Sequence, residues 1–336
     1  MAVDPLVSVV TPFYNTAPYL AGCIESVLAQ TRREYEYLLV NNMSTDGSRE
    51  IAARYAAQDS RLRVIDNPAF VGQVENYNGA IAHIAPGSQY VKIVQADDTI
   101  HPECISRMVE LAEREPGVGL VSSYWLNGEL AEGTGVPEGV SRLSGREACR
   151  KMLLDGCYLL GSPTTVLYRA DIVRSRKPFY ALGRYHEDTE AGYEILLQSD
   201  LGFVHQVLSF IRADNVSITT STLAFNSSDL DYFIVLERYG PQVLTAEELT
   251  RQRAYSHGGY YRFLGRALLR FQGQAFWDYH RAGLATVGWT LRWRDVIYEA
   301  ALELGRLASS PRSTVKQGVA DVRRRFRRSS LRPPRG

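Results

Sequence analysis

Two adjacent aspartates end a strongly apolar segment of the chain. Residues 90–98 read YVKIVQADD, so Asp97 and Asp98 follow a run that is typical of a buried strand. Neighbouring carboxylates repel each other, which costs free energy unless water, a cation or hydrogen-bond donors compensate the charge. Mg²⁺ and Mn²⁺ prefer oxygen ligands and need few protein carboxylates when a diphosphate supplies the others. The pair therefore predicts a divalent-cation site that forms together with a substrate.

A second acidic group occupies residues 184–197, which read RYHEDTEAGYEILL. The apolar residues 195–197 indicate a helix whose first turn holds Glu187, Asp188 and Glu190. Acidic residues favour a helix N-terminus because they interact favourably with the helix dipole. The pattern by itself leaves open whether these carboxylates stabilise the helix or take part in chemistry.

The elements that must position these acids alternate along the first 125 residues. Parallel strands that are joined by single helices form right-handed crossovers, and their sheet is buried on both faces. Ligands of such sheets bind at the carboxyl ends of the strands, where polar residues gather in this sequence. The pattern predicts an α/β nucleotide-binding fold. The expected strands are 6–10, 35–40, 62–66, 90–94 and 118–124, and the polar residues after the first three are Thr11, Pro12, Tyr14, Asn15, Asn41, Asn42, Ser44–Asp46 and Asn67.

The composition and the missing motifs exclude several classes of protein. The chain is 45% hydrophobic and 22% charged, as globular proteins are, and its four cysteines form no CxxC pair. No GxGxxG or GxxxxGK[ST] phosphate loop occurs. The most apolar later stretch, residues 282–291, is about half the length that spans a bilayer, and residues 1–10 lack a leader pattern. We expect a cytoplasmic protein that does not cross a membrane.

Five segments of the chain together resemble the family-2 glycosyltransferases, which have the GT-A fold. The resemblance extends over roughly residues 5–215 and implies transfer of a sugar from a nucleotide-diphosphate donor, usually with inversion and with Mg²⁺ or Mn²⁺. A sugar nucleotidyltransferase would need a glycine-rich basic loop after the first strand, and residues 11–19 are neither. The five segments are VSVVTPFYN (7–15), YLAGCIESVLAQT (19–31), EYLLVNNMSTDGS (36–48), NPAFVGQVENYNGAI (67–81) and VQADDTIHP (94–102).

The resemblance also implies roles for single residues. Asp97 and Asp98 match the metal-binding DXD element, with Asp98 preferred as the direct metal ligand. Asp188 matches the catalytic base of an inverting transfer, and Glu187 is the alternative. A general base of this kind contributes about 10²–10⁴-fold in rate. The residues expected to bind the donor are Thr11, Pro12, Tyr14, Asn42, Asn78 and Asp97.

Several positions depart from the family's pattern. Asn41 and Asn42 replace two aspartates, Gln95 replaces a third, and Tyr77 stands where many members carry an arginine near the diphosphate. An asparagine amide still accepts a hydrogen bond from uracil or thymine, so a UDP- or dTDP-sugar is favoured. Arg212 is then expected to help neutralise the diphosphate. The departures keep a second hypothesis open, namely a catalytically silent nucleotide-sugar-binding or scaffold protein with the same fold.

The chain is expected to contain four regions. Residues 1–125 form the nucleotide-sugar-binding half of the GT-A domain and residues 126–225 its acceptor and catalytic half. Residues 226–310 form a helical region, and residues 311–336 form a basic amphipathic or disordered tail.

This tail contains nine Arg or Lys residues and one Asp, although the whole chain has a formal net charge of only +1. Its apolar residues Val315, Val319, Val322 and Phe326 share one helical face. A basic amphipathic segment suits an anionic membrane surface, at about 1 kcal/mol per basic residue. Nucleic acid is disfavoured because the rest of the chain is acidic. We expect a peripheral protein on the inner face of the membrane, acting on a glycan or a lipid-linked acceptor.

Overall fold

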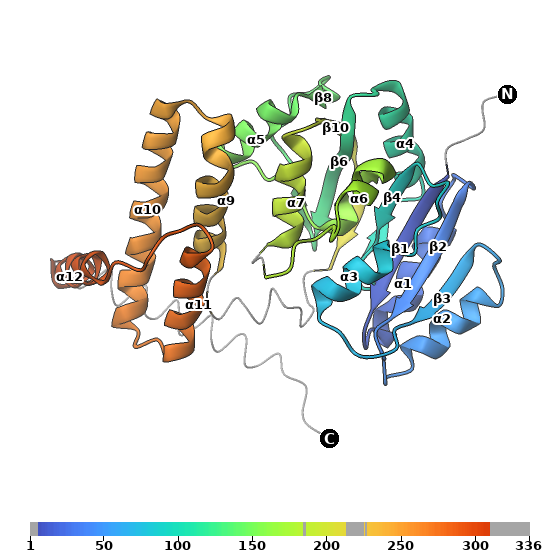
Figure 1. The fold of residues 1–336 in the computed structure, drawn as a ribbon, viewed down its shortest axis with the longest axis horizontal. Coiled ribbons are helices and arrows are strands. Elements are labelled where there is room, and N and C mark those ends of the chain that lie inside the picture. The colour runs from blue at the N-terminus through green and yellow to red at the C-terminus, as the bar shows by residue number, and fades with distance from the viewer. Residues whose placement is uncertain (1–5, 184–185, 213–224, 226, 310–336) are drawn as a thin grey trace. The chain divides into compact units, whose positions relative to one another are not determined.

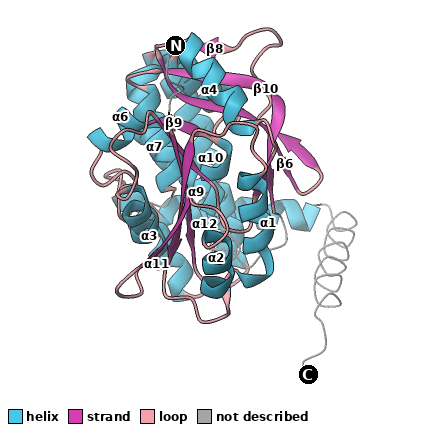
Figure 2. Cartoon of the chain, turned by 90° about the vertical axis from the view of Figure 1, so that its right-hand side faces the viewer, coloured by secondary structure: helices cyan, strands magenta, loops and turns pink. Residues whose placement is uncertain are grey.

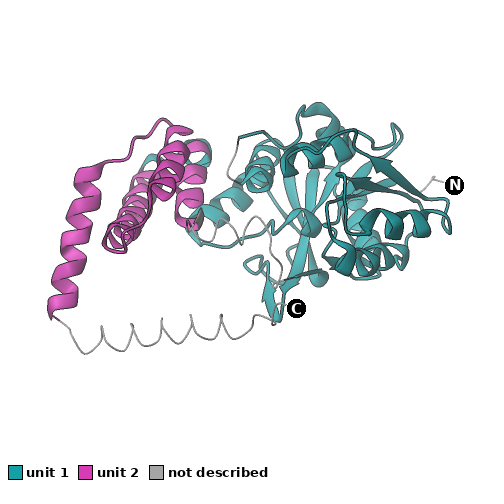
Figure 3. Cartoon of the chain, turned by 90° about the horizontal axis from the view of Figure 1, so that it is seen from below, with its two compact units in different colours: residues 1–221, 239–246 teal, residues 222–238, 247–336 magenta. Residues whose placement is uncertain are grey.

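The computed structural model describes residues 6–183, 186–212, 225 and 227–309. The chain divides into two compact units (Figure 3). Unit 1 comprises residues 1–221 and 239–246, and unit 2 comprises residues 222–238 and 247–336. The two expected halves, 1–125 and 126–225, share one sheet and fall almost entirely within unit 1.

Unit 1 is built on a mixed sheet with the strand order β3-β2-β1-β4-β9-β6-β10-β5, which runs through the middle of the unit with helices around it (Figures 1 and 2). The pairs β1·β2, β2·β3, β1·β4 and β6·β10 are parallel. Short strands β7 and β8 pair with β6 and β10. The strands are β1 (Val7–Phe13), β2 (Tyr35–Asn41), β3 (Leu62–Asp66), β4 (Tyr90–Ile93), β5 (Thr99–Ile100), β6 (Val118–Asn127), β7 (Leu130–Glu132), β8 (Arg142–Leu143), β9 (Leu167–Arg169) and β10 (Asp200–Ile211).

The predicted, mostly parallel sheet is confirmed, with one departure in strand order. Strand β9 lies between β4 and β6 and is antiparallel to both. Strands β4 and β6 are therefore not neighbours in the sheet, although the predicted α/β alternation places one directly after the other. Local periodicity could not reveal this, because β9 comes from a segment more than seventy residues after β4.

Helices connect the first strands, as the spacing of apolar residues predicts. In α1, Leu20, Ile24 and Val27 recur on one face and are fully buried, and Pro18 occupies the first turn, where its missing N–H costs nothing. The helices of unit 1 that follow the strands or precede them are α1 (Ala17–Leu28), α2 (Ser48–Ala56), α3 (Gln73–Ile81), α4 (Cys104–Arg114), α5 (Gly145–Leu154), α6 (Ala170–Ser175), α7 (Glu187–Leu196) and a 3₁₀ turn, η1 (Pro163–Thr165).

The expected helical region is also present. Its helices are α9 (Ser227–Val243), α10 (Ala246–Leu269), α11 (Gln274–Ala285) and α12 (Trp293–Ser309). Within unit 2, the fully buried His280 contacts the ring of Phe276 and shares a hydrogen bond with Tyr260, so that α10 and α11 meet in an aromatic core. Among the described residues, no helix is long and apolar enough to span a bilayer.

Candidate active site

The carboxyl ends of β1, β2 and β4 meet at one edge of the sheet. In the parallel register, Phe13 lies beside Asn41 and Val10 lies beside Ile93. The residues that follow these strands, Tyr14, Asn42 and the acidic pair, therefore emerge at the same edge. By "acidic pair" we mean Asp97 and Asp98.

Asp98 points into the protein interior. Its side chain is only 3% exposed, and each carboxylate oxygen already accepts a hydrogen bond. The donors are the Thr164 hydroxyl at 2.6 Å and the backbone N–H of Arg212 at 3.1 Å. Burial raises the pKa of Asp98 to about 7, and the charge of Asp97 contributes in the same direction.

The preference for Asp98 as the direct metal ligand stays a prediction, and these surroundings favour the other member of the acidic pair. A direct ligand needs an accessible oxygen, whereas both oxygens of Asp98 are buried and accept hydrogen bonds. Asp97 is the more exposed member of the acidic pair, and partial burial raises the pKa of its carboxyl. Its carboxylate is thus the better placed of the two for an incoming cation.

A fully buried lysine lies beneath the acidic pair. Lys92 donates hydrogen bonds to the backbone carbonyls of Thr164 and Val166, and burial lowers its pKa. Thr164 in turn accepts a hydrogen bond from the backbone N–H of Gln95. This network fixes η1 against the loop after β4. Sequence reasoning missed Lys92 and Thr164, although a lysine inside a buried strand was a signal for the first of them.

Tyr14 is the most accessible of the predicted donor-binding residues. Its side chain is 45% exposed, and its ring lies 4.9 Å from the ring of Phe70, which is 60% exposed. Sequence reasoning did not single out Phe70. Exposed aromatic faces at the ligand-binding edge of a sheet can stack on a nucleotide base.

Thr11 and Pro12 are both buried. The Thr11 hydroxyl shares a hydrogen bond of 3.0 Å with the Tyr37 hydroxyl and lies 3.9 Å from the sulfur of Cys23 in α1. This side chain therefore packs between the sheet and α1. The contact of Thr11 and Pro12 with a base or ribose stays a prediction.

The Asn42 amide makes three hydrogen bonds within the protein. Its nitrogen donates to the Val71 carbonyl, and its oxygen accepts from the Val71 N–H and from the Asn67 side chain. Asn42 thus holds the loop that precedes α3. Recognition of a base by this residue remains a prediction, and it would require exchange of one of these bonds.

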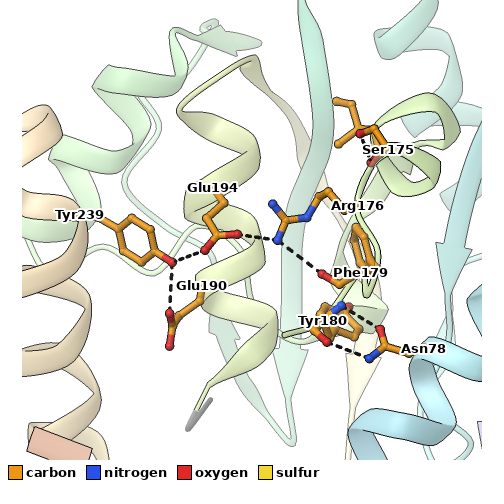
Figure 4. Close-up of polar contacts among 9 residues, drawn as sticks. Asn78, Ser175, Arg176, Phe179, Tyr180, Glu190, Glu194 and Tyr239 are labelled. Carbon is orange, nitrogen blue, oxygen red and sulfur yellow. Dashed lines mark hydrogen bonds and ion pairs between the residues drawn. The ribbon is translucent and has the colours of Figure 1, made fainter. Parts of the chain in front are cut away.

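Asn78 likewise makes two hydrogen bonds at 2.8 Å, to the backbone carbonyl and from the backbone N–H of Tyr180. It ties α3 to the segment that precedes α7 (Figure 4). The contact of Asn78 with the donor stays a prediction.

Asp188 lies at the start of α7 and lines a small cavity together with Gly161, Ser162 and Gly192. Burial raises the pKa of the Asp188 carboxyl, and the positive charge of His186 opposes this effect. Burial and the Asp188 charge raise the pKa of the neighbouring Glu187 to about 7. The Ser162 hydroxyl oxygen is buried without a hydrogen-bond partner among the described residues.

The fold brings the two acidic groups together around Tyr77. This residue is 7% exposed. Burial raises its pKa, and the charges of both members of the acidic pair and of Asp188 raise it further. The contacts of η1 connect the same two groups, because Thr164 donates a hydrogen bond to Asp98 and Ser162, two residues earlier, lines the cavity of Asp188.

A chain of polar contacts holds the helix that carries Asp188 (Figure 4). The Tyr239 hydroxyl from α9 lies 2.9 Å from Glu194 Oε1 and 3.1 Å from Glu190 Oε2. The other oxygen of Glu194 pairs with Arg176 at 2.6 Å. Because Arg176 also approaches the Phe179 carbonyl, α7 is fixed on two sides by segments that lie far away in the sequence.

Arg212 lies beside the acidic pair. Its guanidinium stacks on the ring of Tyr19, with 3.5 Å between the guanidinium carbon and the ring centroid. Its Nη1 atom is buried and has no hydrogen-bond partner among the described residues. A guanidinium N–H with unused hydrogen-bonding capacity is suited to an anionic oxygen.

Comparisons with known proteins relate the chain to glycosyltransferases. The model of the family described as Glycosyl transferase family 2 matches residues 8–156. Glycosyltransferase GlyG of Streptococcus pneumoniae serotype 4 is 28% identical over 230 residues, which cover 64% of this chain and 73% of GlyG. The putative teichuronic acid biosynthesis glycosyltransferase TuaG of Bacillus subtilis is 34% identical over 106 residues, covering 32% of this chain and 41% of TuaG.

Solved structures share the fold at low sequence identity. S. aureus TarS 1–349 in complex with UDP-GlcNAc gives a TM-score of 0.63 at 16% identity, covering 92% of each chain. The mannosyltransferase PcManGT from Pyrobaculum calidifontis, in complex with GDP-Man and Mn²⁺, gives 0.55 at 15% identity, covering 95% of this chain and 84% of that one. The family-2 match extends over residues 8–156. Together with the named glycosyltransferase relatives it indicates a glycosyltransferase, and the solved structures show that the chain has the GT-A fold.

Proposed function

We propose that the protein is a metal-dependent, inverting glycosyltransferase. It transfers a sugar from a nucleotide-diphosphate donor, with a UDP- or dTDP-sugar favoured, to a hydroxyl of a glycan or lipid-linked acceptor. The observation that carries the proposal is geometric: Asp98 is hydrogen-bonded to Thr164 of η1, and Ser162, two residues before Thr164, lines the same cavity as Asp188. An inverting transfer needs a site for the donor diphosphate and a separate base near the acceptor, and these two acidic groups supply them.

Asp97 would hold the Mg²⁺ or Mn²⁺ ion. Among the described residues, no three His, Cys, Asp or Glu side chains form a group that could hold a metal. One carboxylate suits a cation that takes most of its oxygen ligands from the donor diphosphate. When bound, such an ion neutralises the charge that develops on the departing nucleotide diphosphate. Asp98 then shapes the loop from beneath, through Thr164 and the Arg212 backbone.

Asp188 acts as the general base. Its carboxylate accepts the proton of the acceptor hydroxyl as that oxygen attacks the anomeric carbon from the face opposite the diphosphate. A raised pKa brings a carboxylate closer to the operating pH and makes it a better proton acceptor. The Ser162 hydroxyl in the same cavity has no hydrogen-bond partner among the described residues, which supports a polar substrate group at this position.

The donor's remaining parts have matching groups on the protein. Arg212 offers an unused N–H to the diphosphate, and Tyr14 and Phe70 offer aromatic faces to the base. The shared fold supports a nucleotide-diphosphate donor, because TarS was solved with UDP and UDP-GlcNAc and PcManGT with GDP-Man. A role in polysaccharide biosynthesis is supported by the similarity to TuaG, a putative teichuronic acid biosynthesis glycosyltransferase.

Calorimetry with UDP, dTDP and GDP, each with and without Mn²⁺, tests the donor site. We expect binding of UDP or dTDP that strengthens with Mn²⁺, and Asp97→Asn should remove the metal-dependent part. The absence of binding by all three nucleotides would refute the proposal. Hydrolysis of a nucleotide-sugar then separates the enzyme from a silent binding protein, because only the enzyme loses turnover in Asp188→Ala.

A further inference from the structure

A cavity of about 570 Å³ lies in unit 1, between the C-terminal end of α3, the loop before β4, and α6 with the segment that follows it. Small-molecule sites in proteins usually measure about 300–1,000 Å³. Pro86, one of the lining residues, precedes β4, whereas the acidic pair follows the other end of that strand. This space, which we call the α3–α6 cavity, therefore lies toward the edge of the sheet opposite to the acidic pair.

Three basic residues line the α3–α6 cavity, namely Arg174, Arg176 and Lys177. Its lining residues all belong to the described part of the chain, and none of them is acidic. Arg174 is anchored, because its guanidinium donates hydrogen bonds of 2.8 Å to the backbone carbonyls of Ala85 and Ser88. Lys177 is exposed. Cations that gather in a concave site without carboxylates attract an anionic ligand.

Arg176 has hydrogen-bonding capacity left for such an anion. Its Nη2 atom pairs with Glu194 of α7 at 2.6 Å and lies 3.4 Å from the Phe179 carbonyl oxygen (Figure 4). Its Nε atom is buried and has no hydrogen-bond partner within the residues that the structure describes. Buried polar groups are nearly always hydrogen-bonded, and a guanidinium N–H bonds most strongly to carboxylate or phosphate oxygens. Because Arg176 lines the cavity, this N–H indicates a ligand oxygen there.

Much of the remaining wall is apolar. Ile81, Val173 and Phe179 are buried, and Ile84 is half-buried beside them. An inorganic anion by itself would leave this apolar wall against water. A purely apolar molecule would leave the basic residues without a counter-charge. The ligand that suits both parts of the cavity joins an anionic group to an apolar one.

The balance of charge indicates which anion this is. Arg174, Arg176 and Lys177 carry three positive charges, and the ion pair with Glu194 neutralises one of them. A phosphate monoester carries a charge of about −1.5 to −2 at pH 7, which matches the remainder. We propose that the α3–α6 cavity binds a phosphate monoester of a compact apolar group, with the phosphate at Arg176 and Lys177 and the apolar group on the wall.

Binding at this site would act on the helix that carries Asp188. A phosphate that bonds to Arg176 competes with Glu194 for the same guanidinium, and this ion pair is one of the contacts that fix α7. Weaker fixation of α7 would displace Asp188, so the bound ester should inhibit transfer. This inhibition rests on the proposed function, whereas binding of the ester involves neither the metal nor Asp188.

Calorimetry with hexyl phosphate, inorganic phosphate and 1-hexanol tests the proposed ligand class. We expect hexyl phosphate to bind about tenfold or more tightly than inorganic phosphate, because its apolar chain leaves water. We expect 1-hexanol to show no binding at the same concentrations. Equal affinity for hexyl phosphate and inorganic phosphate would overturn the ester site, and so would the absence of hexyl phosphate binding.

Four variants test the location. Lys177→Gln removes a charge and Ile84→Asp adds a repelling one, so each should weaken hexyl phosphate binding about tenfold. Glu194→Gln removes the carboxylate that competes for Arg176 and should strengthen binding. Lys151→Gln, on α5, is the matched lysine control and should leave the affinity unchanged. Circular dichroism melting of each variant excludes unfolding as the cause, and an equal loss in the Lys151 variant would overturn the site.

Competition separates this site from the donor site, because Asn78 lines the cavity and is also a predicted donor-binding residue. Displacement of hexyl phosphate by UDP with Mn²⁺ would place the ester at the donor site and overturn the proposal. Donor hydrolysis should slow as hexyl phosphate is added, and an unchanged rate at saturation would overturn the inhibition. A protein that binds hexyl phosphate but hydrolyses no donor in its absence would refute the proposed function alone.

Discussion

The Thr164 hydroxyl donates a hydrogen bond of 2.6 Å to Asp98 Oδ2 and so joins η1 to the loop after β4. Asp98 is buried, so loss of this donor leaves part of a carboxylate unsatisfied, at a cost of about 1–3 kcal/mol. Thr164→Val should therefore lower the free energy of unfolding by that amount in urea titration. Thr164→Ser keeps the hydroxyl and serves as the control. Equal stability of the Val and Ser variants would show that the bond contributes nothing.

The two members of the acidic pair should respond differently to removal of charge. Asp97→Asn should lower the rate of donor hydrolysis by two orders of magnitude or more and abolish its dependence on Mn²⁺, with little change in stability. Asp98→Asn should destabilise the fold, because an amide nitrogen cannot accept from Thr164 or the Arg212 backbone. Thermal melting together with initial rates separates the two effects. If Asp98→Asn proved as stable as the wild type, the structural role assigned to Asp98 would be wrong.

Asp188→Asn should lower the transfer rate by about 10²–10⁴-fold and leave donor affinity unchanged. The isosteric amide keeps the shape of the side chain but cannot accept a proton. Glu187→Gln is the matched neighbour and should retain most of the activity. Rates and calorimetry on both variants decide between the two acids, and a larger loss in the Glu187 variant would reassign the base.

The pH dependence of stability has a separate source in unit 2. Burial lowers the pKa of His280 to about 4, against 6.5 for an ordinary histidine. Between these values His280 is protonated in the unfolded chain but neutral in the folded protein. The free energy of unfolding therefore decreases as the pH falls from about 6.5 to about 4. The loss should reach up to about 3 kcal/mol. Urea titration at pH 7 and pH 5 checks this. His280→Gln should remove the part of the slope that His280 contributes, whereas the buried carboxyls of Asp98 and Glu187 act with the opposite sign in both proteins.

Tyr239→Phe removes the donor that Glu190 and Glu194 share. We expect a loss of about 1–3 kcal/mol, because Glu190 is buried, and a lower transfer rate, because α7 carries Asp188. Tyr232→Phe, on the same helix, removes a hydroxyl that contacts Gln252 instead and is the control. Should both variants lose the same transfer rate, the contact with α7 would have no specific part in positioning Asp188.

Several features of this protein could be predicted from the sequence. The spacing of apolar residues predicted β1 to β4 and the helices between them, because burial imposes a local period on each element. The parallel arrangement and the acidic pair at the end of a strand followed from the same pattern. The helical region after residue 226 and the acidic first turn of α7 were also predicted correctly.

Other features depend on contacts between distant parts of the chain. Burial of Asp98 depends on Thr164 and Arg212, and the antiparallel insertion of β9 depends on pairing with two strands that precede it. The amides of Asn42 and Asn78 donate hydrogen bonds to the carbonyls of Val71 and Tyr180, which no local sequence pattern predicts. Residue type and periodicity thus determined which side chains could do chemistry. Only the tertiary structure decided which carboxylates are buried and which are accessible, because desolvation and hydrogen bonding are set by neighbours in space.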